Sequence, residues 1–236
     1  MRSSLLLRLS LAGLFTTATL FATDRPSLGV AEFKNETNVN WWSSDVARDL
    51  AGMLTNELAA TNKFRVVERS KLGHVLDEQD LAASGRMNPS TGAKIGKLTG
   101  AKYLVFATVT AFDSQSRGTG GGISFKGISV GGKKEDAYLA VDLRVVDTTT
   151  GEVDYVRTVE ARASSYGVSG GVSRGYLSGG LSKYENTPTG KAIRGVVMEI
   201  TDYLGCAMVD KDDCMTEYAQ KESARRSKTK KSIKIE

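Results

Sequence analysis

Residues 137–165 read "AYLAVDLRVVDTTTGEVDYVRTVEARASS", and apolar and polar side chains alternate along the first part of this run. The apolar positions are Leu139, Val141, Leu143 and Val145, and the polar positions between them include Asp142 and Arg144. Because successive side chains of a strand point to opposite faces of a sheet, a period of two predicts a strand with one buried face. "TTTGEV" is then a hairpin turn in which Gly151 supplies a positive φ, and "DYVRTVEARASS" is the returning strand.

Short apolar runs alternate with helical patterns on the N-terminal side of this hairpin. We expect strands at Leu28–Phe33, Phe64–Val67 and Ala101–Asp113, and helices capped by Ser44 and by Ser70, with a third over Ser90–Gly100. On the C-terminal side, a helix ending at Gly205 has its apolar residues at helical spacing: Ile193, Val196, Val197, Ile200 and Leu204. This order of elements predicts an α/β fold class, a small domain with a mixed sheet.

The first 22 residues have the composition of a secretory signal peptide. Arg2 and Arg8 precede an apolar run from Leu9 to Phe21, and the small residue Ala22 follows. The run is too short to span a bilayer, so we expect cleavage near Thr23 and export of the chain. We expect no lipid attachment there, because no cysteine lies near the predicted cleavage point.

Positive charge is concentrated at the ends of the chain. The formal net charge is +5, and residues 219–236 alone carry seven Lys or Arg against two acids. A nucleic-acid-binding domain usually carries a basic stripe on its folded body, so we expect no nucleic-acid partner. The C-terminal segment 206–236 therefore ends in a basic tail, which is either disordered or a contact for anionic lipid or a partner.

The search for chemistry finds no catalytic, cofactor or metal site. "GAKIGKLT" and "NTPTGKAI" contain Gly-Lys, but neither has the glycine spacing and the following Ser or Thr of a phosphate-binding loop. His74 is the one histidine, and no nucleophile stands beside a base, so we expect no enzyme and no cofactor. Cys206 and Cys214 either form a disulfide, as export permits, or remain two unlinked thiols.

Three blocks resemble the curli production assembly/transport family, the CsgG-like proteins. They are "FRVVERSKLGHVLDEQ", "TGAKYLVFATVTAF" and "VDLRVVDTTTGEV", and the resemblance runs from about Arg25 to Gly205. It implies an oligomeric outer-membrane channel for the secretion of unfolded curli-type subunits, with possible accessory curli proteins. The α/β domain, residues 23–106 and 137–157 with 187–205, would lie in the periplasm. Subunits of the family form a ring, usually a nonamer, whose extended β-hairpins contribute to one shared transmembrane β-barrel.

Two glycine-rich segments are the candidate transmembrane hairpins, residues 107–136 and residues 158–186. Barrel strands alternate apolar and polar residues, and Ile123 with Phe125, and Val168 with Val172, have this spacing. These four residues are the candidate lipid-facing positions. The alternative is that both segments are flexible surface loops, which their glycine content also permits.

The polar run "NETNVNWWSSD", residues 35–45, carries both tryptophans of the chain. In the family that the sequence resembles, the loop between the first strand and the first helix lines the narrowest point of the channel. This resemblance places Trp41 and Trp42 at the channel constriction, and Asn40 beside them is a third candidate residue of the constriction. The alternative is that one tryptophan packs beside the start of the next helix while the other is half-buried.

A second function remains open beside the channel. A soluble periplasmic module of related CsgG-like fold, which regulates cell-envelope assembly by binding a partner, would need no membrane hairpins. The missing lipid cysteine favours this alternative, whereas the two glycine-rich strand pairs favour the channel.

Overall fold

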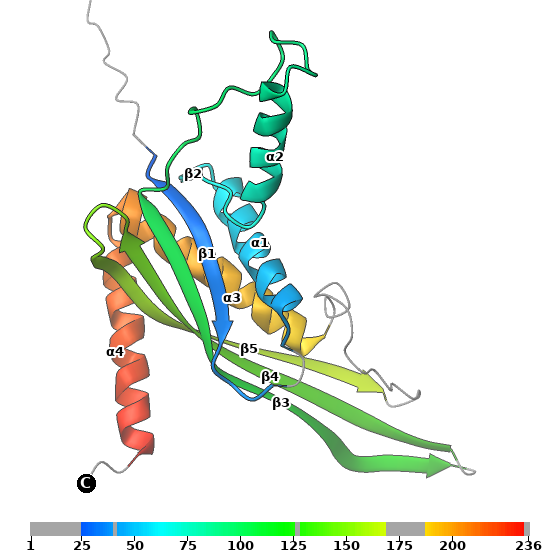
Figure 1. Ribbon diagram of the computed structural model, residues 1–236. Helices are drawn as coiled ribbons and strands as arrows, with labels where there is room; N and C mark the ends of the chain where they lie inside the picture. Colours follow the sequence, from blue (N-terminus) through cyan, green and yellow to red (C-terminus); the bar gives the residue numbers. More distant parts are fainter. Residues whose placement is uncertain (1–24, 40–41, 126–127, 169–186, 234–236) are drawn as a thin grey trace, which may run out of the picture.

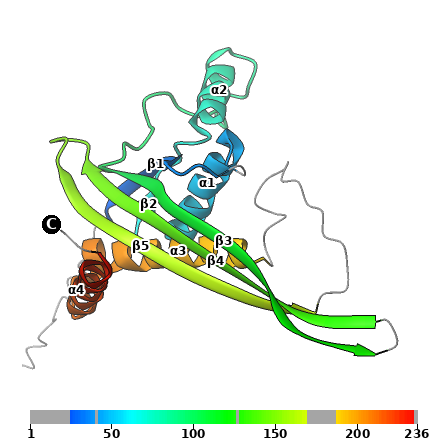
Figure 2. The same ribbon diagram turned by 90° about the horizontal axis from the view of Figure 1, so that it is seen from below.

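The computed structural model describes residues 25–39, 42–125, 128–168 and 187–233. Five strands form one sheet in the order β2-β1-β3-β4-β5, as Figures 1 and 2 show from two directions. The strands are β1 (Ser27–Asn35), β2 (Arg65–Val66), β3 (Tyr103–Phe125), β4 (Ile128–Asp147) and β5 (Val153–Val168). β1 pairs in parallel with β2 and β3, whereas β3, β4 and β5 pair antiparallel, so the sheet is mixed. This arrangement confirms the predicted α/β fold class.

The helices are α1 (Ser44–Ala60), α2 (Leu72–Ala83), α3 (Pro188–Gly205) and α4 (Cys214–Ser232), with a π-helical segment at Cys206–Asp210. Ser43, one residue before the predicted cap, ends the loop before α1, and its Oγ accepts a hydrogen bond from the Val46 amide at 3.3 Å. The predicted cap of α2 at Ser70 is wrong, since Lys71 precedes the helix and provides no side-chain cap. Thr187 caps α3 through the Gly190 amide at 3.1 Å, which leaves Pro188 at the first helical position, where its missing N–H costs little.

The predicted helix over Ser90–Gly100 is also wrong. These residues form turns and irregular backbone, and Gly96 has a φ of 75°, in the left-handed region. Gly92, Gly96 and Gly100 fall within one short segment, and each glycine disfavours a helix by about 1 kcal/mol relative to alanine. Burial does not offset this cost, because the apolar residues Ile95 and Leu98 of the segment are exposed.

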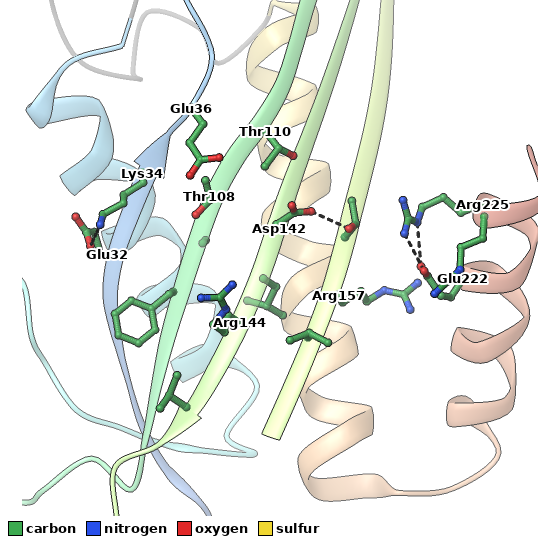
Figure 3. A pocket seen from close by; sticks show the side chains of 17 residues that line it. Glu32, Lys34, Glu36, Thr108, Thr110, Asp142, Arg144, Arg157, Glu222 and Arg225 are labelled. Carbon is green, nitrogen blue, oxygen red and sulfur yellow. Dashed lines mark hydrogen bonds and ion pairs between the residues drawn. The ribbon is translucent and has the colours of Figure 1, made fainter. Parts of the chain in front are cut away.

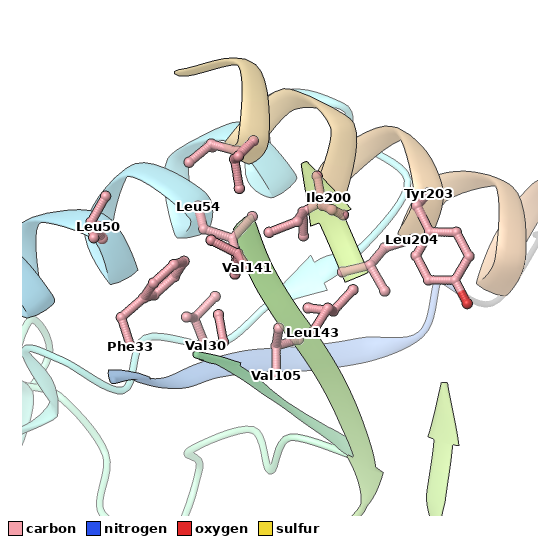
Figure 4. Close-up of a cluster of buried hydrophobic side chains, with 14 of the residues drawn as sticks. Val30, Phe33, Leu50, Leu54, Val105, Val141, Leu143, Ile200, Tyr203 and Leu204 are labelled. Carbon is pink, nitrogen blue, oxygen red and sulfur yellow. The ribbon is translucent and has the colours of Figure 1, made fainter. Parts of the chain in front are cut away.

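One face of the sheet is covered by α1 and α3, and the hydrophobic core lies between these layers (Figure 4). The alternating residues of β4 point into it, since Leu139, Val141, Leu143 and Val145 are all buried. Leu54 of α1 and Ile200 of α3 meet them from the helices and are 0% exposed. The period of two in β4 therefore has the predicted cause, a strand with one face in the core.

The strands β3, β4 and β5 continue well past this core, toward the lower right of Figures 1 and 2. The pairing of β3 with β4 extends to Ile123 opposite Val130 and Phe125 opposite Ile128, and β5 follows β4 as far as Val168 opposite Gly132. β1 accompanies β3 only as far as Val109. The far part of the described sheet, which we call the extension, is thus three-stranded as far as Gly132 and two-stranded beyond it.

The C-terminal segment forms α4, which runs beside the edge of the sheet next to β5 (Figure 1). A disulfide joins Cys206, at the end of α3, to Cys214, the first residue of α4. Most of the basic residues predicted as a tail are therefore part of a helix whose start is covalently tied to the domain. No helix in the described ranges is both long enough and apolar enough to cross a bilayer.

We expect Leu54→Ala to lower the free energy of unfolding by about 2–5 kcal/mol, because it leaves a cavity between α1 and the sheet. Leu81→Ala is the matched control, since Leu81 also lies in a helix but is 40% exposed, and it should cost about 0.5 kcal/mol or less. Urea denaturation of both variants measures the difference. Equal losses would contradict the position of the core.

Candidate functional site

A groove of about 870 Å³ lies on the outer face of the sheet, between the strands and α4 (Figure 3). Its floor consists of the residues that alternate with the core positions, such as Phe106 and Thr108 on β3 and Arg144 and Val146 on β4. One side of the groove is formed by Glu32 and Lys34 of β1 and by Glu36, the residue after β1. The other side is formed by Glu222, Arg225 and Arg226 of α4. The same alternation that builds the core therefore builds this groove.

Several charged groups in the groove already have partners. Lys34 pairs with Glu32 at 3.3 Å, and Thr158 donates a hydrogen bond to Asp142 at 2.7 Å. Glu222 accepts two hydrogen bonds from Arg225, at 2.9 and 2.8 Å, and these bonds hold the pKa of its carboxyl below the usual value.

Arg144 and Arg226 form no salt bridge within the described part of the chain, although the charge of Arg226 contributes to the lowered pKa of Glu222. The groove therefore combines apolar surface with charges of both signs, since Glu32, Glu36, Asp142 and Glu222 also line it. The groove contains no nucleophile next to a base, so its residues indicate recognition rather than catalysis.

Arg157 of β5 holds α4 against the sheet. Its guanidinium lies 5.1 Å from the ring centroid of Tyr203 on α3 and 4.5 Å from that of Tyr218 on α4. One of its nitrogens donates to the Tyr218 carbonyl oxygen at 3.3 Å, and another lies 3.8 Å from the Glu199 carboxylate. The two rings meet edge to face at 5.3 Å, and burial raises the pKa of Tyr218 to about 12. Arg157 and the disulfide thus fix the wall of the groove.

The loop between β1 and α1 is anchored at both ends. The Asn35 side chain accepts from the Thr37 amide at 2.9 Å and donates to the Thr37 carbonyl at 3.0 Å, while the Glu36 amide donates to Val109 of β3 at 2.9 Å. Val109 is the residue at which β1 stops accompanying β3, so the loop starts where the extension leaves the domain. Trp42 is half-buried and packs against the core, whereas Asn40 and Trp41 lie outside the described residues.

The candidate lipid-facing residues fall on the extension as far as it is described. Ile123 and Phe125 belong to the last residue pairs between β3 and β4, and Val168 is the final residue of β5. Val172 lies outside the described residues. The structure therefore brings the described ones to the far end of the same ribbon.

One group of possible metal ligands occurs among the described residues, Cys206, Asp212 and Cys214. Both of its sulfurs belong to the disulfide, and a metal needs cysteine as the thiolate. The group therefore offers one carboxylate and no thiolate.

The groove and the Arg157 cluster did not emerge from the sequence. Arg157 lies in the run predicted as the returning strand, and Tyr218 is the one aromatic residue of the segment 206–236. An aromatic residue followed by basic residues is only a weak indication of a helix packed on the domain. The periodicity of the segment could not distinguish such a helix from a basic tail.

Arg157→Ala should release α4 from the sheet edge, because it removes two ring contacts and a hydrogen bond, together worth on the order of 2 kcal/mol. Trypsin should then release peptides from α4 at least about tenfold faster, as measured by mass spectrometry. Arg157→Lys, which keeps the charge but loses the flat guanidinium, should give an intermediate rate. Digestion at the wild-type rate in both variants would show that Arg157 does not hold the helix.

The chain matches the model of one protein family, described as "Curli production assembly/transport component CsgG", over residues 12–233. The curated protein of that name from Escherichia coli (strain K12) is 26% identical over 137 residues, which are 56% of this chain and 50% of that protein. The chain thus spans about half the length of these curated relatives. The "Putative lipoprotein NMB1126/NMB1164" of Neisseria meningitidis is 28% identical over 185 residues, covering 76% of this chain and 75% of that protein.

Among solved structures, the "hypothetical protein CT253" of Chlamydia trachomatis aligns with a TM-score of 0.44 at 12% identity, over 77% of this chain and 96% of that one. The family match covers nearly all of the described domain, including α4, and the family description names assembly and transport and no catalytic activity. The chain belongs to the CsgG family of curli production assembly/transport components.

Proposed function

We propose that this protein is the subunit of an oligomeric outer-membrane channel that secretes unfolded, curli-type amyloid subunits. The observation that carries the proposal is the extension, which continues the sheet of a CsgG-family domain far beyond its core. The domain itself would lie in the periplasm. The ring of copies, the secreted subunits and any accessory curli proteins would be its partners.

The two edges of the extension support assembly with further copies. Past Val109, β3 pairs only with β4 among the described strands, and β5 likewise pairs only with β4. Open strand edges expose backbone N–H and C=O groups, which a bilayer cannot satisfy, so a membrane ribbon must pair with neighbours until it closes. Copies that pair edge to edge would close into the shared β-barrel.

The register at the tip agrees with one apolar face. Ile123 is opposite Val130 and Phe125 is opposite Ile128, while Ser124 is opposite Ser129. Residues directly opposite in an antiparallel pair share a face, so this register alternates apolar and polar pairs as a barrel strand does. We propose that Ile123 and Phe125, with Val168 and Val172 of the second hairpin, face lipid.

The β1–α1 loop is the proposed constriction of this channel. Its polar residues would face water in the lumen, and Asn40, Trp41 and Trp42 would narrow it. Rigid tryptophan rings can contact any unfolded chain, because they combine a large apolar area with one polar N–H. The contact of Trp42 with the core would hold the loop in place.

A soluble periplasmic binding module is the second candidate function. The groove on the outer face of the sheet favours this alternative, because its residues indicate recognition rather than catalysis. The mixed-charge groove would then bind the partner.

Extraction separates the two functions. For the channel, the protein should leave the membrane fraction only with detergent, and negative-stain electron microscopy should show rings. A monomer that is recovered in the soluble fraction without detergent would contradict the channel and support the binding module.

Trp41→Ala should widen the channel and raise its single-channel conductance in a planar bilayer, with an unchanged thermal midpoint. Trp42→Ala should raise the conductance too, but lower the thermal midpoint, because Trp42 also contacts the core. The double variant should have the largest conductance. Wild-type conductance in all three variants would show that neither tryptophan lies at the constriction.

A further inference from the structure

The last two turns of α4 stand clear of the domain. Tyr218 is the buried residue of this helix, and Glu222 and Arg225 further along it are half-buried. Every residue in the range 226–233 is exposed. We call this range the basic end, because its charged side chains are all positive: Arg226, Lys228, Lys230 and Lys231.

Cations nearer the start of α4 are paired with acidic side chains. Lys221 lies 3.0 Å from the Glu217 carboxylate, and Arg225 lies 2.8 Å from that of Glu222. The three lysines of the basic end form no salt bridge with an acid of the described ranges. Their charge therefore does not hold α4 on the domain.

The basic end also carries more charge than the helix itself requires. Cations are favourable near the C-terminus of a helix, and Lys230 and Lys231 lie in the last turn of α4. Like charges three or four residues apart repel each other, however, and Lys228 with Lys231 and Arg226 with Lys230 have these spacings. An anionic surface against the basic end would relieve this repulsion.

The basic end lies on the same side of the domain as the far end of the extension. In Figure 1 both are at the bottom, whereas β2 and α2 are at the top. Figure 2, seen from below, looks nearly along the axis of α4, so the helix runs toward that side. Because the proposed channel has the extension in the bilayer, the membrane surface would lie on this side of the domain.

We propose that the basic end of α4 binds the anionic phospholipid headgroups of the membrane that the extension enters. Clusters of Lys and Arg beside a membrane-spanning segment are attracted to anionic lipid, and each cation adds to the attraction. Ile233, which follows the last turn of the helix and is 50% exposed, adds apolar surface suited to the boundary between headgroups and acyl chains. The disulfide and Arg157 hold the other end of α4, so the helix connects the domain to the membrane surface. This inference rests on the proposed function, to which it adds a lipid contact.

Limited trypsin digestion of the full-length protein in lipid vesicles tests the contact. One preparation contains phosphatidylcholine alone, and the other contains phosphatidylcholine mixed with anionic phosphatidylglycerol. The measured quantity is the rate of cleavage after Arg226 divided by the rate after Lys94, which is exposed in the segment after α2. This ratio should be about tenfold or more lower in the anionic vesicles. High salt should remove the difference, because it screens exposed charges.

Reversal of the three lysines should abolish the effect. A triple variant with Lys228→Glu, Lys230→Glu and Lys231→Glu should give the same ratio in both kinds of vesicle, because anionic lipid no longer attracts the basic end. Each variant is compared only with itself in the two lipids. Any direct effect of the new side chains on trypsin therefore cancels.

A second triple variant is the matched control. Lys71→Glu, Arg86→Glu and Lys97→Glu reverse three exposed cations that precede or follow α2, at the top of Figure 1. This variant should keep the full difference between the two kinds of vesicle. Circular dichroism establishes that both triple variants are folded.

Inorganic phosphate added to the neutral vesicles distinguishes a membrane surface from a site for a free anion. Phosphate should leave the ratio unchanged, because the proposed contact needs many headgroups held in one surface. Protection of the bond after Arg226 by phosphate alone would overturn the lipid contact.

The remaining outcomes separate this inference from the proposed function. A protein that enters neither kind of vesicle overturns the channel and the lipid contact together. A protein that enters both with the same cleavage ratio overturns the lipid contact alone. A difference that persists in the lysine variant also overturns it, because the basic end is then not its source.

Discussion

The antiparallel register between β3 and β4 is the constraint on which the other features depend. It sets Val105 opposite Val145 and Ala107 opposite Leu143, and all four side chains are buried in the core. The positions between them, such as Phe106 opposite Arg144, line the groove on the other face. A slip of one residue would exchange the two faces and expose the core, so the hydrophobic effect holds this register firmly. The same two strands pair on into the extension, where the register shifts between Val109 and Ala111 and again between Thr119 and Ile123.

The groove needs a second wall, and α4 provides it through contacts that are remote in sequence. The disulfide fixes the start of the helix, and Arg157, which contacts the rings of both Tyr203 and Tyr218, fixes its first turns against β5 and α3. The attraction between a guanidinium and an aromatic ring is strongest where water is excluded, and the Arg157 side chain is only 10% exposed. Without these contacts, the basic residues of α4 would form no part of a site.

The extension is incomplete when the subunit is alone. It presents strand edges that no described strand covers. Backbone N–H and C=O groups at a strand edge need another strand as their hydrogen-bond partner. In a ring of identical copies each subunit would supply that strand to its neighbour, which is why the extension and the proposed ring belong together.

The sequence by itself determined the features that depend on local periodicity. The alternation in residues 137–147, the hairpin turn at Gly151 and the apolar spacing of residues 193–204 predicted elements that the structure contains, because one buried face imposes its period on the chain. The family was also evident from three short blocks. Only the tertiary structure decided the rest. The segment 90–100 is irregular because its glycines outweigh a weak helical pattern. The position of Arg157 and the groove beside α4 depend on residues that are far apart in sequence, such as Arg157 and Tyr218, which are 61 positions apart. No local pattern records which distant side chains will meet, because that is settled by how the layers pack.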